Sequence, residues 1–189
     1  MINEGKPFLK WAGGKTQLLP EIKKILPNSL HRVKFTFIEP FVGGGAFLFW
    51  MLRNYPNMEK AIINDINTDL TNTYLSIKHD TSELINILSK WENQYHRVYS
   101  SKEEAKLYFY EKRAVFNARS STQIEQAALF IFLNKTCFNG LYRVNGKNLF
   151  NVPIGRSASM PKICDVENLN NVSKLLFFGT KRHWKVCEK

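Results

Sequence analysis

The sequence predicts an α/β fold that is interrupted by a block of helices, and three observations indicate it. Residues 35–52 have the order strand, glycine-rich turn, helix. A second short strand, residues 61–63, is followed by a helix from about Thr68. Residues 82–134 then carry apolar side chains at helical spacing, with no strand alternation. The first two observations predict the opening of a Rossmann-like α/β unit, and the third predicts a helical insertion in it.

The elements follow from local patterns along the chain. Residues 35–40 (FTFIEP) form a short apolar run that ends in a proline, and residues 41–45 (FVGGG) form the turn before the apolar helix 46–52. In the insertion, Glu103 and Glu104 follow two serines and indicate a helix start, and residues 123–133 predict a further, more apolar helix. Asn139-Gly140 and Asn145-Gly146 are turn signals on either side of residues 141–144, which predicts a hairpin or an ordered loop.

Composition limits the classes of protein. The 189 residues suffice for one good hydrophobic core, and no apolar run approaches the roughly 18 residues of a membrane span. The N-terminus lacks the basic start and apolar stretch of a signal peptide, so we expect a soluble, cytoplasmic protein. Three widely spaced cysteines argue against disulfides and against a zinc site, and we expect free, mostly buried thiols.

Charge points to a polyanionic partner. The formal net charge is +11, and no acidic residue occurs between Glu125 and Asp165. Phosphate neutralisation supplies much of the affinity for nucleic acids, so this segment is a candidate DNA-facing surface. A lysine-rich composition or a loop with solvated charges explains the same pattern. The basic residues of the segment are Lys135, Arg143, Lys147, Arg156 and Lys162.

The glycine turn and Asp65 form the first candidate site. Asp65 lies 22 residues beyond Gly43, close to the spacing at which an acid after the second strand meets a ribose hydroxyl. Glycines allow a ligand to approach the backbone closely, although an ordinary tight turn explains them too. A dinucleotide dehydrogenase would have a third glycine at position 48, where this chain has Leu48. The pattern therefore favours another nucleoside-containing cofactor.

Residues 8–15 (FLKWAGGK) form a second candidate. Gly14-Lys15-Thr16 is similar to the end of a P-loop, but the first glycine of that motif would occupy position 9, which is Leu9. A P-loop nucleotide site is therefore excluded. Trp11 beside paired glycines is either a packed anchor or a ligand contact, and the residues alone favour neither.

Together these segments resemble the Dam-type family of DNA adenine-N6 methyltransferases, including the GATC methyltransferases of restriction systems. The resemblance runs from about Pro7 to Leu176 and rests on four motifs in the family's order. These are FLKWAGGK (8–15), EPFVGGG (39–45), NDINTDL (64–70) and NKTCFNGLYRVNGKNLFNVPIG (134–155).

The resemblance implies specific ligands and specific residues. It implies a Rossmann-like methyltransferase fold that binds S-adenosylmethionine, double-stranded DNA as the substrate, a GATC-like target and no metal ligand. The residues that match cofactor contacts are Trp11, Lys15, Phe41, Gly43, Gly45 and Asp65. Those that match DNA contacts are Lys10, Phe138, Asn139, Leu141, Arg143 and Pro153, and Lys147 is expected to meet phosphate.

The chain departs from the family at the catalytic motif. The family's [Asp/Asn]-Pro-Pro-[Tyr/Phe/Trp] motif accepts hydrogen bonds from the target amine, but no two of the seven prolines are adjacent here. We therefore expect no catalytic residue and a truncated or frameshifted tail. The alternatives are a non-catalytic DNA-binding remnant and one half of a split enzyme, completed by a C-terminal fragment. A partner restriction endonuclease is a further expectation.

The same resemblance predicts three regions. Residues 1–78 form the N-terminal part of the catalytic domain. Residues 79–163 form a helical target-recognition domain with a hairpin loop. Residues 164–189 return to the catalytic domain, where the sheet is expected to be incomplete.

Overall fold

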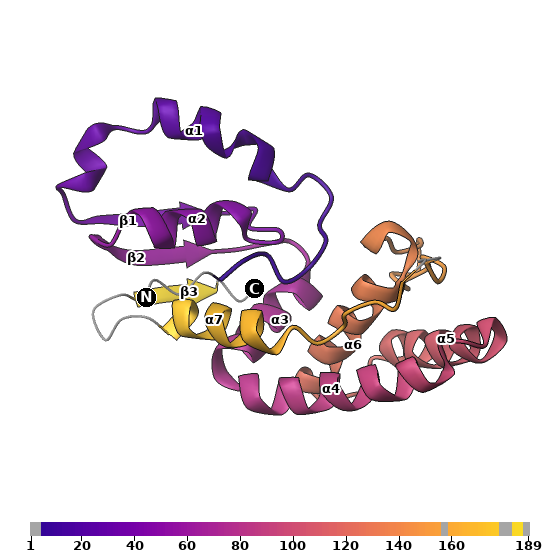
Figure 1. Ribbon diagram of the computed structural model, residues 1–189. Coiled ribbons are helices and arrows are strands. Elements are labelled where there is room, and N and C mark those ends of the chain that lie inside the picture. Colours follow the sequence, from indigo (N-terminus) through magenta and orange to yellow (C-terminus); the bar gives the residue numbers. More distant parts are fainter. Residues whose placement is uncertain (1–4, 156–158, 178–182, 187–189) are drawn as a thin grey trace.

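The computed structural model describes residues 5–155, 159–177 and 183–186, and it has a small parallel sheet covered by helices (Figure 1). The strands are β1 (Phe35–Glu39), β2 (Met58–Ile63) and β3 (His183–Val186), in the order β1-β2-β3. Both pairings are parallel, and in the register Ile63 lies beside Glu39 on one side and Val186 on the other. The chain is therefore a mixed α/β protein, mostly helical, in which β2 is the central strand.

The first half of the α/β unit forms as its sequence predicts. On β1, Phe37 and Glu39 are buried while Thr36 and Ile38 are exposed, which is the period-two pattern of a strand. The helix α2 (Ala46–Asn54) begins directly after the glycine turn and continues two residues beyond the predicted end. The second strand starts at Met58, three residues earlier than predicted, because Met58 is buried in the core as completely as Ile63.

Residues 15–31 contain elements that the sequence patterns did not indicate. They form two single turns of 3₁₀ helix, η1 (Lys15–Leu18) and η2 (Asn28–His31), on either side of the short helix α1 (Leu19–Ile25). No residue of these three elements is fully buried, so they lack the apolar periodicity that would predict them. In Figure 1 α1 lies on one side of the sheet and α3 and α7 on the other.

The predicted block of helices is confirmed. It consists of α4 (Thr81–Val98), α5 (Lys102–Ala118) and α6 (Gln123–Thr136), preceded by α3 (Thr68–His79) and followed later by α7 (Val166–Phe177). Side-chain caps fix three of the starts: Asn67 for α3, Ser101 for α5, and a capping box of Thr122 and Glu125 for α6. Apolar α6 lies in the middle of the layer, where it packs against α3, α4 and α5.

Of the two forms predicted for the segment after α6, a hairpin or an ordered loop, the structure has the ordered loop. After α6 the chain makes a 3₁₀ turn, η3 (Phe138–Gly140), and returns with two isolated antiparallel bridges, Cys137 to Ile154 and Val144 to Phe150. Asn139 and Asn148 have positive φ angles of 54° and 57°, which interrupt an extended ladder. We refer to residues 137–154 as the recognition loop, after the role that the sequence predicts for them.

One continuous cluster of buried apolar side chains runs from the sheet into the helices. It includes Cys137 and Cys164, which are free and buried as expected, whereas Cys187 lies outside the described residues. The division into three regions stays a prediction. Across the described ranges, no helix combines the length and the apolar composition that crossing a membrane requires.

Candidate functional site

The glycine turn, which follows β1, is hydrogen-bonded to the two residues that come directly after β2. The Val42 amide donates to the carbonyl of Asn64 (2.9 Å), and the Gly43 amide donates to the Asp65 carboxylate (3.0 Å). Gly43 and Gly45 have φ angles of +52° and +80°, in the left-handed region that favours glycine. A Cβ on Gly45 would lie 2.5 Å from the Tyr74 hydroxyl, so this position has no room for a side chain.

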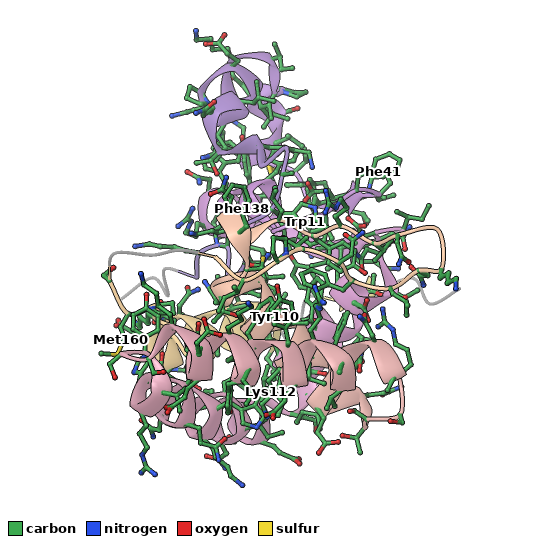
Figure 2. All side chains as sticks on the ribbon, turned by 90° about the vertical axis from the view of Figure 1, so that its right-hand side faces the viewer. Trp11, Phe41, Tyr110, Lys112, Phe138 and Met160 are labelled. Carbon is green, nitrogen blue, oxygen red and sulfur yellow. The ribbon has the colours of Figure 1, made fainter. Side chains whose placement is uncertain are left out.

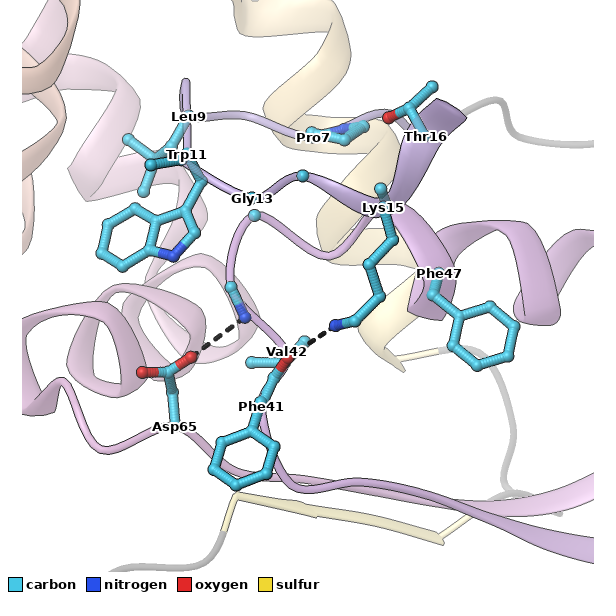
Figure 3. Close-up of a pocket in the computed structure, with 15 residues that line it drawn as sticks. Pro7, Leu9, Trp11, Gly13, Lys15, Thr16, Phe41, Val42, Phe47 and Asp65 are labelled. Atoms are coloured by element: carbon cyan, nitrogen blue, oxygen red, sulfur yellow. Dashed lines mark hydrogen bonds between the residues drawn. The ribbon is translucent and has the colours of Figure 1, made fainter. Parts of the chain in front are cut away.

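A cavity of about 420 Å³ opens between the N-terminal segment and the glycine turn (Figure 3). Five of the six residues predicted to contact the cofactor line it: Trp11, Lys15, Phe41, Gly43 and Asp65. The sixth, Gly45, does not line the cavity; it is the N-cap of α2 and shapes the turn from behind. The volume lies within the range of about 300 to 1,000 Å³ that is usual for small-molecule sites.

The cavity wall presents groups suited to a nucleoside. Each oxygen of Asp65 accepts one backbone amide, from Gly43 and from Asn67, and each retains a second lone pair for a ligand. Phe41 is 73% exposed at the mouth of the cavity. Trp11 packs so closely on Gly43 that an added Cβ would lie 2.8 Å from its ring. Aromatic faces, a carboxylate and an accessible backbone are thus gathered around one space.

Lys15 is held by a buried carboxylate. Its Nζ lies 2.8 Å from Glu39 Oε1 and 2.8 Å from the carbonyl oxygen of Phe41. Glu39 is 5% exposed, and burial raises its pKa while the ammonium of Lys15 opposes that rise. The pair therefore closes one side of the cavity and leaves Lys15 partly accessible there.

Predicted DNA contacts lie on and beside the recognition loop, adjacent to the cavity. Lys10 rests against the 3₁₀ turn, where a Cβ on Gly140 would be 2.6 Å from the Lys10 side chain. Phe138 and Leu141 are 49% and 40% exposed. Figure 2 shows Phe138, Trp11 and Phe41 on the same side of the helix that carries Tyr110. Asn139, Lys147 and Pro153 are exposed as well.

Arg143 is oriented by the loop itself. Its Nε donates to the side chain of Asn151 (2.8 Å), and the backbone amide of Asn151 donates to the carbonyl of Arg143 (3.1 Å). Within the described residues, the two terminal nitrogens of Arg143 form no hydrogen bond, so they are available for a fork-shaped contact. The guanidinium is thus aimed before any ligand arrives.

The broader basic surface predicted from charge is only partly realised. Lys135 is half-buried on α6, and burial lowers its pKa, so it is poorly placed for a phosphate. Lys162 is exposed and pairs with Asp165 at 2.8 Å. Arg156 lies outside the described residues. Arg143 and Lys147 are the two basic side chains that the recognition loop itself exposes.

Sequence patterns did not single out Asn134, which joins the two parts of the site. Its side chain accepts from the amide of Lys10 (2.9 Å) and donates to the carbonyls of Lys10 and Gly140 (both 2.8 Å). Asn134 is 3% exposed. The available signal was a polar residue at the end of an otherwise apolar helix, since a buried amide requires partners. In the ranges with described placement, no cluster of His, Cys, Asp or Glu could hold a metal ion.

Comparisons with known proteins identify similar chains. The family model for D12 class N6 adenine-specific DNA methyltransferases matches residues 11–184. The match passes Leu176, where the motifs had placed the end of the likeness, and it reaches β3.

Two relatives are named type II methyltransferases. M.MjaIII of Methanocaldococcus jannaschii is 49% identical over 176 residues, which is 92% of this chain and 60% of that protein. M1.LlaDCHI of Lactococcus lactis subsp. cremoris is 37% identical over 174 residues, or 90% and 55%. A DNA adenine methylase of Haemophilus influenzae is 41% identical over 150 residues, or 79% and 47%. The chain thus spans about half the length of these relatives.

Proposed function

The chain belongs to the D12 class of N6 adenine-specific DNA methyltransferases, and from that premise we propose that its cavity binds S-adenosylmethionine while its recognition loop reads DNA. The observation that carries the proposal is the convergence of Trp11, the glycine turn and Asp65 on one cavity. These segments are separated in sequence, yet they supply the aromatic, backbone and carboxylate groups that a nucleoside requires.

Each wall has a definite role in binding the methyl donor. The two oxygens of Asp65 accept hydrogen bonds from ribose hydroxyls, and Trp11 and Phe41 provide apolar faces. Gly43 has no Cβ, so the ligand can approach the backbone of the glycine turn closely. When bound, S-adenosylmethionine supplies an electrophilic methyl group on sulfur. The protein residues orient this group and exclude water from it.

On the DNA side, Arg143 is proposed to make a bidentate contact with a guanine of a GATC-like target. Its free terminal nitrogens match the two acceptors that guanine presents in the major groove. Lys10 is proposed to read the other outer guanine, and Lys147 to meet a phosphate. The remaining proposed contacts to bases, or to the space beside a flipped adenine, are Phe138, Asn139, Leu141 and Pro153.

Methyl transfer also requires acceptors for the adenine amine. Its lone pair is delocalised into the ring, so a nucleophilic nitrogen needs oriented oxygen acceptors and a stacking partner. The 189 residues contain no adjacent prolines and hence no acceptor motif of the family's type. We therefore propose that these residues bind both substrates, while methyl transfer depends on acceptors that lie outside these 189 residues.

Calorimetric titration with S-adenosylmethionine tests the pocket. The unmodified chain should bind it, and Asp65→Ala should weaken binding by about 1.5 to 3 kcal/mol, roughly ten- to a hundredfold, because a charge-assisted hydrogen bond is lost. Asp80→Ala is the matched control, since it removes an exposed carboxylate at the end of α3. Equal affinity in folded Asp65→Ala and Asp80→Ala would remove Asp65 from the site.

A further inference from the structure

Tyr142 belongs to the recognition loop and contacts a residue of the cavity wall. Its ring stacks on Trp11 with centroids 5.8 Å apart and an interplanar angle of 25°. The same tryptophan also packs against Gly43 and lines the cavity. Tyr142 also immediately precedes Arg143 in the chain. A single aromatic side chain therefore touches the cavity wall and shares a peptide bond with the residue proposed to read guanine.

The hydroxyl of Tyr142 is held by the buried carboxylate of Asp69, which also pairs with the partly exposed Arg119. It donates to Asp69 Oδ2 (3.0 Å), and the other oxygen of Asp69 pairs with Arg119. Asp69 is 7% exposed and lies on the first turn of α3, four residues after the Asp65 that holds the glycine turn. Burial raises the pKa of Tyr142 to about 12, so its hydroxyl remains a donor at neutral pH.

The loop has a separate set of contacts that hold its base. Asn117 on α5 accepts from the amide of Phe150 (2.8 Å) and donates to its carbonyl (3.0 Å). Asn134 holds Gly140 at the other end of the loop. The bond from Tyr142 to Asp69 is therefore an additional connection toward the cavity, and the loop keeps its anchors without it.

We propose that Tyr142 is a positioning residue that couples occupation of the cavity to the order of the recognition loop. The inference rests on the proposed function. A ligand that fixes Trp11 also fixes the ring stacked on it, and with that ring the backbone that aims Arg143. Coupling between two binding sites is reciprocal, so the cofactor and DNA should strengthen each other's binding by the same factor.

The test measures binding of a GATC-containing duplex by fluorescence anisotropy, with and without saturating S-adenosylhomocysteine as the unreactive probe. In the unmodified chain the probe should tighten DNA binding about tenfold, within the usual range for coupled sites. Tyr142→Phe keeps the ring and loses the bond to Asp69, so the factor should fall. Tyr142→Ala should bring it close to one.

Tyr108→Phe is the matched control. It also removes a hydroxyl that donates one hydrogen bond, to Gln94 Oε1 at 2.8 Å, but it does so between α4 and α5, away from the cavity. The coupling factor should stay unchanged in this variant. In addition, the probe alone should slow hydrogen exchange of amides 137–154 in the unmodified chain and not in Tyr142→Ala.

The outcomes separate coupling from simple packing. If Tyr142 only fills space, its variants lower both DNA affinities equally and keep the factor, which overturns the inference and leaves the proposed function intact. A factor of one in the unmodified chain has the same consequence. No binding of S-adenosylhomocysteine to the unmodified chain overturns the proposed function and the coupling together. If Tyr142→Ala is unfolded by circular dichroism, Tyr142→Phe against Tyr108→Phe decides the matter.

Discussion

The cavity and the recognition loop, for which we propose different ligands, are ordered in different ways. The cavity is built from backbone: the glycine turn is bonded to Asn64 and Asp65 and backed by the buried ring of Tyr74. The recognition loop is fixed at its base, while the side chains proposed to meet DNA are exposed. A small ligand requires a preformed wall, whereas a duplex must be approached by side chains that reach outward.

The largest expected effect concerns methyl transfer, because neither the cavity nor the recognition loop supplies acceptors for the adenine amine. We expect no methyl transfer by the 189-residue chain on a GATC duplex, because losing even one preorganised transition-state donor or acceptor costs on the order of a hundredfold in rate. Transfer of tritiated methyl groups from S-adenosylmethionine measures this. Adding a fragment that carries Asp-Pro-Pro-Tyr should restore incorporation. Methyl transfer by the chain alone at rates typical of the family would show that these 189 residues supply the acceptors themselves.

Because the backbone of the glycine turn is more tightly packed than that of the recognition loop, an added methyl group should destabilise the turn more than the loop. Gly45→Ala should lower the free energy of unfolding by about 2 to 4 kcal/mol, because it combines a strained left-handed residue with overpacking against Tyr74 and Phe49. Gly146→Ala is the control in the loop, where no atom lies within 4 Å of the added Cβ and φ is not positive. It should change stability by less than about 0.5 kcal/mol.

Urea denaturation followed by circular dichroism gives both values. A similar loss of stability in the two variants would mean that the loop backbone is as constrained as the glycine turn. The cavity wall and the recognition loop would then not differ in backbone order.

Two basic side chains of the recognition loop, Arg143 and Lys147, should contribute differently to DNA binding. Arg143→Ala should reduce the preference for GATC over a scrambled duplex by about 1 to 3 kcal/mol, because a bidentate contact to guanine is lost. Lys147→Ala should weaken binding to both duplexes alike, since a phosphate contact carries no sequence information. Anisotropy titrations at fixed salt measure both effects. Equal weakening by Arg143→Ala on the two duplexes would reassign Arg143 to the phosphates.

Local patterns in the sequence determined much of the fold and part of the site. The strand, glycine turn and helix of residues 35–54 follow from alternation, glycine content and apolar periodicity, all of which act over a few residues. The capping box of Thr122 and Glu125 starts α6 where a helix was predicted. The spacing of Gly43 and Asp65 predicted their proximity, because two parallel strands with a short crossover bring their carboxyl ends together.

Only the tertiary structure decided how the N-terminal segment, the loop and the helices meet. Asn134 joins Lys10 to Gly140, and Tyr142 bridges Trp11 and Asp69, across separations of up to 131 residues that no local pattern encodes. The sequence left open whether residues 137–154 form a hairpin or an ordered loop, and the structure has the loop, with two isolated bridges and positive φ angles at Asn139 and Asn148. These contacts depend on packing around α6, which places distant segments side by side and requires each buried polar group to find a partner there.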